Sequence, residues 1–209
     1  MRAPNEQFRI AVTVPTITFA VLWTATIATP KLPPPPTAQD IALQVDPAQS
    51  KVHYSVESTL HTVHGTFALK NGSVVHFDPV TGKASGQVTV YATSGDSGNS
   101  SRDERMHNEV LESHKYSDVI FRPAQVEGSV AQSGTSDVKL RGTLFLHGAE
   151  HEIVATVHAN LMGDRWNGTA SFQVPYVQWG LKNPSTWLLK VKPVVTVELD
   201  MAGSASTPK

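Results

Sequence analysis

The chain has 209 residues, a length typical of one domain with a core of its own. Its formal net charge of -1 argues against nucleic acid as a partner, because nucleic-acid-binding domains normally carry a basic surface. The chain has no cysteine, which excludes a disulfide framework, thiol catalysis and zinc sites built on thiolates.

Residues 1–28 have the pattern of a secretory signal peptide. Arg2 and Arg9 give a basic start, residues 10–30 carry no charge, and small residues around Ala25 and Ala28 could be cleaved. The alternative is an uncleaved membrane anchor, since ~20 apolar residues can span a bilayer. The threonines and Pro15 that interrupt the apolar stretch favour cleavage. We therefore expect a periplasmic or secreted protein, held near the membrane by its N-terminus if cleavage fails.

A proline-rich linker is predicted for residues 29–44. Its segment KLPPPPTAQD holds four consecutive prolines, which impose polyproline II and cannot join a sheet. The folded domain is accordingly expected to span residues 45–203.

Within that domain, apolar and polar residues alternate as they do in half-buried strands. The final predicted strand places one apolar face against a polar one, its apolar residues being Val195, Val197, Leu199 and Met201. Turn signals such as Asn71-Gly72 and Thr81-Gly82 separate the runs. The pattern predicts about eight antiparallel strands in a sandwich or an up-and-down barrel. A barrel of this size can be filled by its own side chains or can hold one small ligand, and periodicity leaves both readings open.

One stretch, Thr93 to Phe121, departs from the strand rhythm. Ser101 followed by Glu104 forms a capping box, which predicts one short helix over residues 101–113. Such a helix could close one end of a barrel.

Four segments in order resemble those of the YceI-like family, the polyisoprenoid-binding proteins. They are SKVHYSVESTLHTVHGTF, SGNSSRDERMHNEVLESHKYSDVIF, GTLFLHGAEHEI and VPYVQWGL. The matching positions are Asn99, Arg102, Asp103, Tyr116, Phe121, Leu144, Leu146, His147, Gly148, Trp179 and Gly180. The chain departs from the family pattern after Asp103, where a His-Leu pair is usual, and at Ser117, where proline is common.

The resemblance implies a lipocalin-like antiparallel barrel, export to the periplasm, and an isoprenoid lipid or quinone tail held inside. It implies a carrier or reservoir with no cofactor, no metal and no chemistry of its own, and it makes a homodimer plausible. The candidate apolar walls are Val56, Phe67, Phe77, Val90, Phe121, Leu144, Leu146, Phe172, Trp179 and Trp187. Asn99, Arg102 and His147 are candidates for a polar mouth, although each also suits a structural role in its loop or turn.

Three other readings stay open. The segment GDSG, which contains Ser97, resembles a serine protease nucleophile segment but also suits a flexible loop. His147 and His151 flank one turn, as His61 and His64 lie close together, so a metal-dependent enzyme is a second reading. A filled barrel that binds a partner protein is the third.

Overall fold

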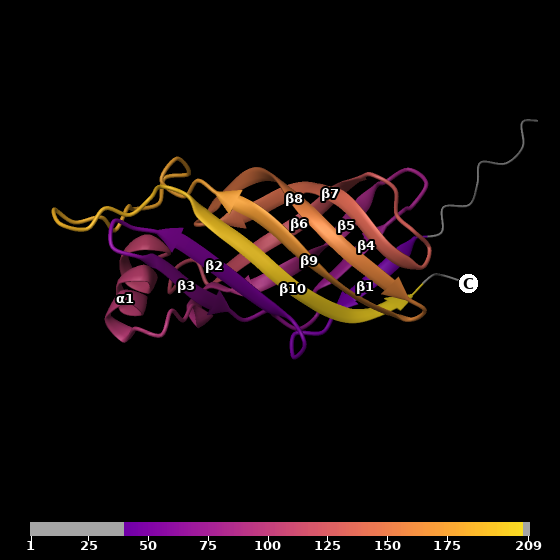
Figure 1. Cartoon of the computed structure of the whole chain (residues 1–209), viewed down its shortest axis with the longest axis horizontal. Coiled ribbons are helices and arrows are strands. Elements are labelled where there is room, and N and C mark those ends of the chain that lie inside the picture. The colour runs from indigo at the N-terminus through magenta and orange to yellow at the C-terminus, as the bar shows by residue number, and fades with distance from the viewer. Residues whose placement is uncertain (1–39, 207–209) are drawn as a thin grey trace, which may run out of the picture. The chain divides into compact units, whose positions relative to one another are not determined.

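The computed structural model describes residues 40–206, which form one closed antiparallel barrel (Figure 1). Besides the strands there are a 3-10 turn η1 (Ala92–Ser94), a helix α1 (Ser100–Arg105) and a π-helical turn η2 (Met106–Val110). The strands are β1 (Ile41–Val45), β2 (Lys51–Glu57), β3 (Thr62–Phe67), β4 (Val74–Phe77), β5 (Ala84–Tyr91), β6 (Asp118–Glu127), β7 (Gly134–Leu146), β8 (Ala149–Met162), β9 (Arg165–Val174) and β10 (Val195–Ser206).

The strands occupy eight positions around the ring, although ten are present. β4 to β10 follow one another with neighbours paired, and β1 closes the ring by pairing with both β4 and β10. The last residues of β10 pair with β1 while residues 196–200 pair with β2, so β1 and β2 share one position. β3 and β4 share another position in the same way, β3 beside β2 and β4 beside β1. The predicted all-β barrel of about eight strands is confirmed.

The barrel begins four residues earlier than expected, which corrects the domain boundaries. Ile41–Val45, partly assigned to the linker, forms β1, and β10 runs to Ser206. The sequence pattern of β1 is weak, because it covers only five residues next to a proline-rich segment. The strand forms because it completes the backbone pairing of both β4 and β10. The predicted signal peptide and the four prolines lie outside the described residues. Between residues 40 and 206 no helix has the length and apolar character needed to cross a membrane.

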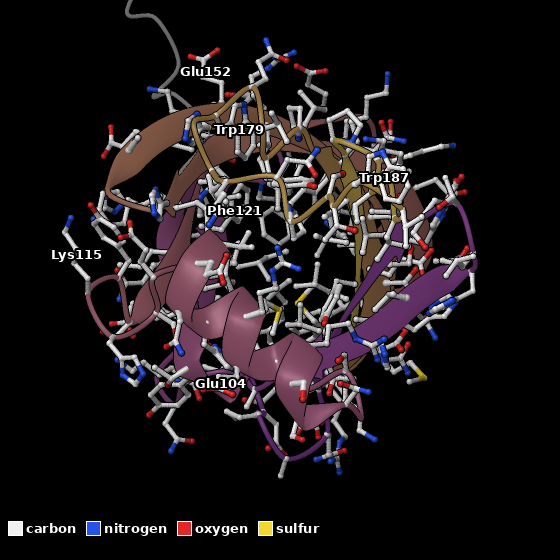
Figure 2. All side chains as sticks on the ribbon, turned by 90° about the vertical axis from the view of Figure 1, so that its left-hand side faces the viewer. Glu104, Lys115, Phe121, Glu152, Trp179 and Trp187 are labelled. Atoms are coloured by element: carbon white, nitrogen blue, oxygen red, sulfur yellow. The ribbon has the colours of Figure 1, made fainter. Side chains whose placement is uncertain are left out.

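The predicted helix is present but starts with a different cap. Asn99, not Ser101, is the N-cap, because its side-chain oxygen accepts a hydrogen bond of 3.0 Å from the backbone N–H of Arg102. The α-helix ends at Arg105 and continues as one π-turn to Val110, with Leu111 N–H donating to Met106 O. Figure 2 shows this helix lying across the end of the barrel, which we call the mouth.

Candidate ligand-binding cavity

The barrel is hollow: a cavity of about 630 Å³ runs through its interior. Ligand sites for small molecules are typically ~300–1,000 Å³. Its wall consists of the inward-facing residues of the strands, such as Val45, Val88, Ile153 and Leu199. The hollow contradicts a barrel filled by its own side chains.

The polar residues of the lining gather at the mouth. The loop before α1, the helix itself and the β2–β3 loop contribute Asn99, Ser101, Arg102, Arg105, Ser58 and His61. Since Asn99, Ser101 and His61 are exposed to solvent, the cavity reaches the surface here. Met106, Val110 and Leu111 also line it, so the helix forms part of the roof. The site is an apolar chamber with a polar entrance under a helical cover.

Seven of the ten predicted wall residues line this cavity. They come from six strands and are Val56, Phe67, Val90, Phe121, Leu144, Leu146 and Phe172. Figure 2 shows Phe121 inside the ring of strands. Their contact with a ligand remains a prediction.

The structure places the other three predicted wall residues outside the cavity. β4 presents Val75 to the cavity, and Phe77, at the strand's end, is buried beyond it. Trp179 lies in the loop after β9, where its ring stacks on His151 with centroids 4.0 Å apart. Trp187 is 88% exposed on a protruding loop. Alternation assigned Phe77 and Trp187 to a face, and the family resemblance supplied Trp179, but neither could tell what each residue packs against.

The three residues predicted for a polar mouth are engaged in holding the loops. Asn99 caps α1, as described above. Arg102 donates from Nε to the Ser97 hydroxyl (2.7 Å) and from its terminal nitrogen to the Ser97 carbonyl (2.8 Å), so it ties the helix to the preceding loop. His147 does not line the cavity: its Nε2 lies 2.7 Å from Glu112 Oε2, which joins the β7–β8 turn to the segment after the helix.

Six polar lining residues were not among the predicted site residues: Tyr54, Ser58, His61, Ser101, Arg105 and Tyr176. Arg105 Nε is buried and has no hydrogen-bond partner among the described residues, its nearest carboxylate oxygen, of Glu109, being 3.6 Å away. The Tyr176 hydroxyl is likewise buried without a partner, and burial raises its pKa. Helical spacing offered a weak signal for Arg105, which lies one turn after Arg102. Orphaned donors in a cavity are free to bind an oxygen of a ligand.

The side chains around Ser97 do not form the catalytic arrangement of a serine hydrolase. Its hydroxyl donates to Asp103 Oδ1 and accepts from Arg102, and neither partner can serve as the histidine base of a triad. The nearby His107 is engaged elsewhere, with Gly95 O at 2.9 Å and Ser113 Oγ at 3.0 Å. The GDSG segment therefore acts here as a loop that anchors the helix.

The paired histidines point to different partners. His147 faces Glu112, while His151 stacks on Trp179, and burial lowers the pKa of His151. Across residues 40–206, no three His, Asp or Glu side chains come together as metal ligands would.

Comparison with known proteins agrees with this architecture. The model of the YceI-like domain matches residues 43–202. The crystal structure of BcnA from Burkholderia cenocepacia is similar with a TM-score of 0.63 and 16% identity, covering 77% of this chain and 99% of that one. A polyisoprenoid binding domain from Saccharophagus degradans, implicated in plant cell wall breakdown, gives a TM-score of 0.57 and 16% identity over 80% of this chain and 98% of that one.

A YceI protein from Campylobacter jejuni gives a TM-score of 0.50 and 17% identity, covering 66% of this chain and 81% of that one. Among curated proteins none is a significant match. At such identities the solved structures establish the barrel fold and nothing finer. The domain match covers most of the chain, includes the helix and its loop, and agrees with the four segments noted in the sequence. The chain therefore belongs to the YceI-like family.

Proposed function

We propose that this protein binds an isoprenoid lipid, with its tail inside the barrel, and acts as a carrier or reservoir without chemistry of its own. The observation that carries the proposal is the apolar cavity of about 630 Å³ with its polar entrance. An isoprenoid tail has no hydrogen bonds to satisfy, so an apolar wall of suitable shape is sufficient. Burial contributes ~0.8 kcal/mol per methylene-sized group, offset by the cost of ordering the chain. One structurally similar protein is described as a polyisoprenoid binding domain, which supports the same ligand class.

The two orphaned donors favour a tail that carries an oxygen-bearing head, such as a quinone. Arg105 Nε and the Tyr176 hydroxyl are buried at the cavity without hydrogen-bond partners among the described residues, and an unsatisfied buried donor costs ~1–3 kcal/mol. A carbonyl oxygen of a quinone could accept from either donor. A plain hydrocarbon would leave both donors unpaired.

The N-terminal pattern supports export, which we propose places the protein in the periplasm or outside the cell. The test is the N-terminal sequence of the protein purified from a bacterial host, expected to begin after Ala28. A protein that retains Met1 would show an uncleaved anchor. A homodimer also remains a prediction, and light scattering at several concentrations would test it.

Native mass spectrometry and solvent extraction test the binding proposal. The purified full chain is expected to carry one isoprenoid per barrel, or to take up an added isoprenoid quinone to that stoichiometry. A chain that stays free of lipid and takes up none would refute the proposal.

Tyr176→Phe tests the role of the head group. It is expected to weaken quinone binding about two- to tenfold, the value of one hydrogen bond of ~0.5–1.5 kcal/mol. It should leave the binding of squalene, an isoprenoid without oxygen, unchanged. Because the hydroxyl has no partner among the described residues, the melting temperature of the ligand-free protein should not fall. Equal weakening of both ligands would contradict a contact with the head.

A further inference from the structure

The mouth of the barrel carries a protruding loop with an apolar tip. Residues 182–192, which we call the finger, extend beyond the end of the barrel past α1 (Figure 1). The finger turns back on itself at its tip, where Thr186 N–H donates to Leu189 O at 2.7 Å. At its base the finger is tied to the β2–β3 loop and to the end of β2, since Thr59 N–H donates to Lys190 O and Lys192 N–H to Glu57 O. The finger and the β2–β3 loop therefore form one joined projection.

Three large apolar side chains on this projection face solvent. Trp187 is 88% exposed, Leu188 78% and Leu60, on the β2–β3 loop, 77%. They are the most exposed large hydrophobic residues between residues 40 and 206. Single exposed apolar residues are ordinary, but three on two adjoining loops at the entrance of an apolar cavity indicate an interaction surface.

The same two loops line the cavity on their inner side. Leu189 and Val191 of the finger and His61 of the β2–β3 loop belong to the cavity lining. Whatever covers the outer side of the projection therefore lies directly against the entrance.

We propose that the finger and Leu60 dock the mouth of the barrel onto a phospholipid bilayer. Tryptophan favours the membrane–water interface because its ring is apolar and its N–H is polar, and leucine favours the acyl region below. A tip of this kind needs only to insert, whereas a stable protein interface needs ~800 Å² from each partner. Three side chains at the end of a narrow loop suit the first and are too few for the second.

The charges of the finger suit this surface. Lys182, Lys190 and Lys192 are its only charged residues, so it carries no acid that an anionic lipid would repel. Lys182 pairs with Glu109 and Lys192 with Glu57, which leaves Lys190 without an ion pair among the described residues. Because two of the three lysines have acidic partners, attraction to anionic lipids is secondary and apolar insertion is the main contribution. Docking would let a tail pass between bilayer and cavity without crossing water.

Because the chain has no cysteine, one introduced cysteine is the single site at which a thiol-reactive label attaches. Leu188→Cys in the full chain carries the environment-sensitive dye NBD, and phosphatidylcholine vesicles contain a nitroxide-labelled lipid as quencher. The matched control is Asp164→Cys, exposed in the β8–β9 turn at the other end of the barrel. Both proteins have the same N-terminus, whether or not it is cleaved, so the N-terminus cannot favour one label over the other.

The label at position 188 is expected to shift to the blue and to be quenched on adding vesicles, while the label at position 164 stays unchanged. Adding Leu60→Ser and Trp187→Ser should weaken the response at 188 about tenfold or more without lowering the melting temperature, since both side chains are exposed. The readout needs no bound ligand, so docking and lipid retention can fail independently.

Three results would overturn the inference. The first is a label at 188 that stays in water with vesicles, or is quenched no more than the label at 164. The second is a response that requires anionic lipid and survives both serine substitutions. The third is a blue shift at 188 without vesicles that grows with protein concentration, which would show that a second copy covers the tip.

Discussion

Substituting Ala155 by phenylalanine would test the hollow barrel most directly. Ala155 on β8 is 4% exposed and lines the cavity, so a larger side chain at this position must project into the hollow. A cavity of ~150 Å³ holds one benzene, so one phenyl ring would take about a quarter of the 630 Å³. That volume would exclude about one isoprene unit of five carbons. At ~0.8 kcal/mol per carbon the loss is at most ~4 kcal/mol, and less after the ordering cost is recovered.

We therefore expect Ala155→Phe to weaken binding of an isoprenoid quinone between about tenfold and several hundredfold, measured by fluorescence titration. The melting temperature should stay within ~2 °C of the parent, because a ring that enters empty space displaces nothing. The matched control is Val154→Phe, the preceding residue on the same strand, which is 40% exposed and points outward. It should leave binding unchanged.

Two results would refute this reasoning. Unchanged binding would show that the ligand does not occupy the barrel. A fall in melting temperature of several degrees, as ~1–3 kcal/mol of overpacking produces in a full core, would show that the cavity is not available.

Other perturbations distinguish the remaining readings. Leu146→Arg places a charge in the apolar lining and should abolish lipid retention, whereas Ser97→Ala removes two hydrogen bonds and should lower stability by ~1–2 kcal/mol while retention persists; equal losses of retention would contradict the cavity. A chelator should leave the melting temperature unchanged, and a clear drop would point to a structural metal. Burial lowers the pKa of His151, so below pH ~6.5 the unfolded chain binds more protons than the folded one. The free energy of unfolding therefore decreases as the pH falls through this range. In thermal melts at several pH values, His151→Gln should therefore reduce the loss of stability on acidification, and an unchanged profile would show that His151 is not its source.

The barrel could be predicted because apolar and polar residues alternate strictly where a strand has one face toward the cavity. Val195, Val197, Leu199 and Met201 on β10 all line the interior, as their spacing indicates. The segment with Trp187, Leu189 and Val191 alternates in the same way, yet it forms a loop instead of a strand. Periodicity reports that a face is apolar, and only the tertiary structure decides whether anything covers it.

The polar residues of the site could not be predicted from the sequence, for a different reason. Arg105 Nε and the Tyr176 hydroxyl matter because these two atoms are buried and lack hydrogen-bond partners among residues 40–206. Both properties depend on what every neighbouring segment contributes. Asn99 and Arg102, by contrast, carried a recognisable pattern, and the pattern described a helix cap and a tie to the preceding loop.

The residues that identify the family and the residues that face the cavity therefore overlap only in part. Phe121, Leu144, Leu146, Asn99 and Arg102 belong to both sets, whereas the other six motif residues do not line the cavity. Among the motif residues, Asn99 and Arg102 fix the helical cover and engage their hydrogen bonds in doing so. His147 and Gly148 both adopt positive φ values, 53° and 80°, which the two-residue turn between β7 and β8 requires. These constraints maintain the shape of the mouth whatever the barrel contains. Because the wall needs only to be apolar and of suitable size, those of its residues that lie outside the motifs can change without disturbing them. We expect ligand choice among such barrels to follow the wall and its orphaned donors, and similarity in the motifs to report the shared architecture.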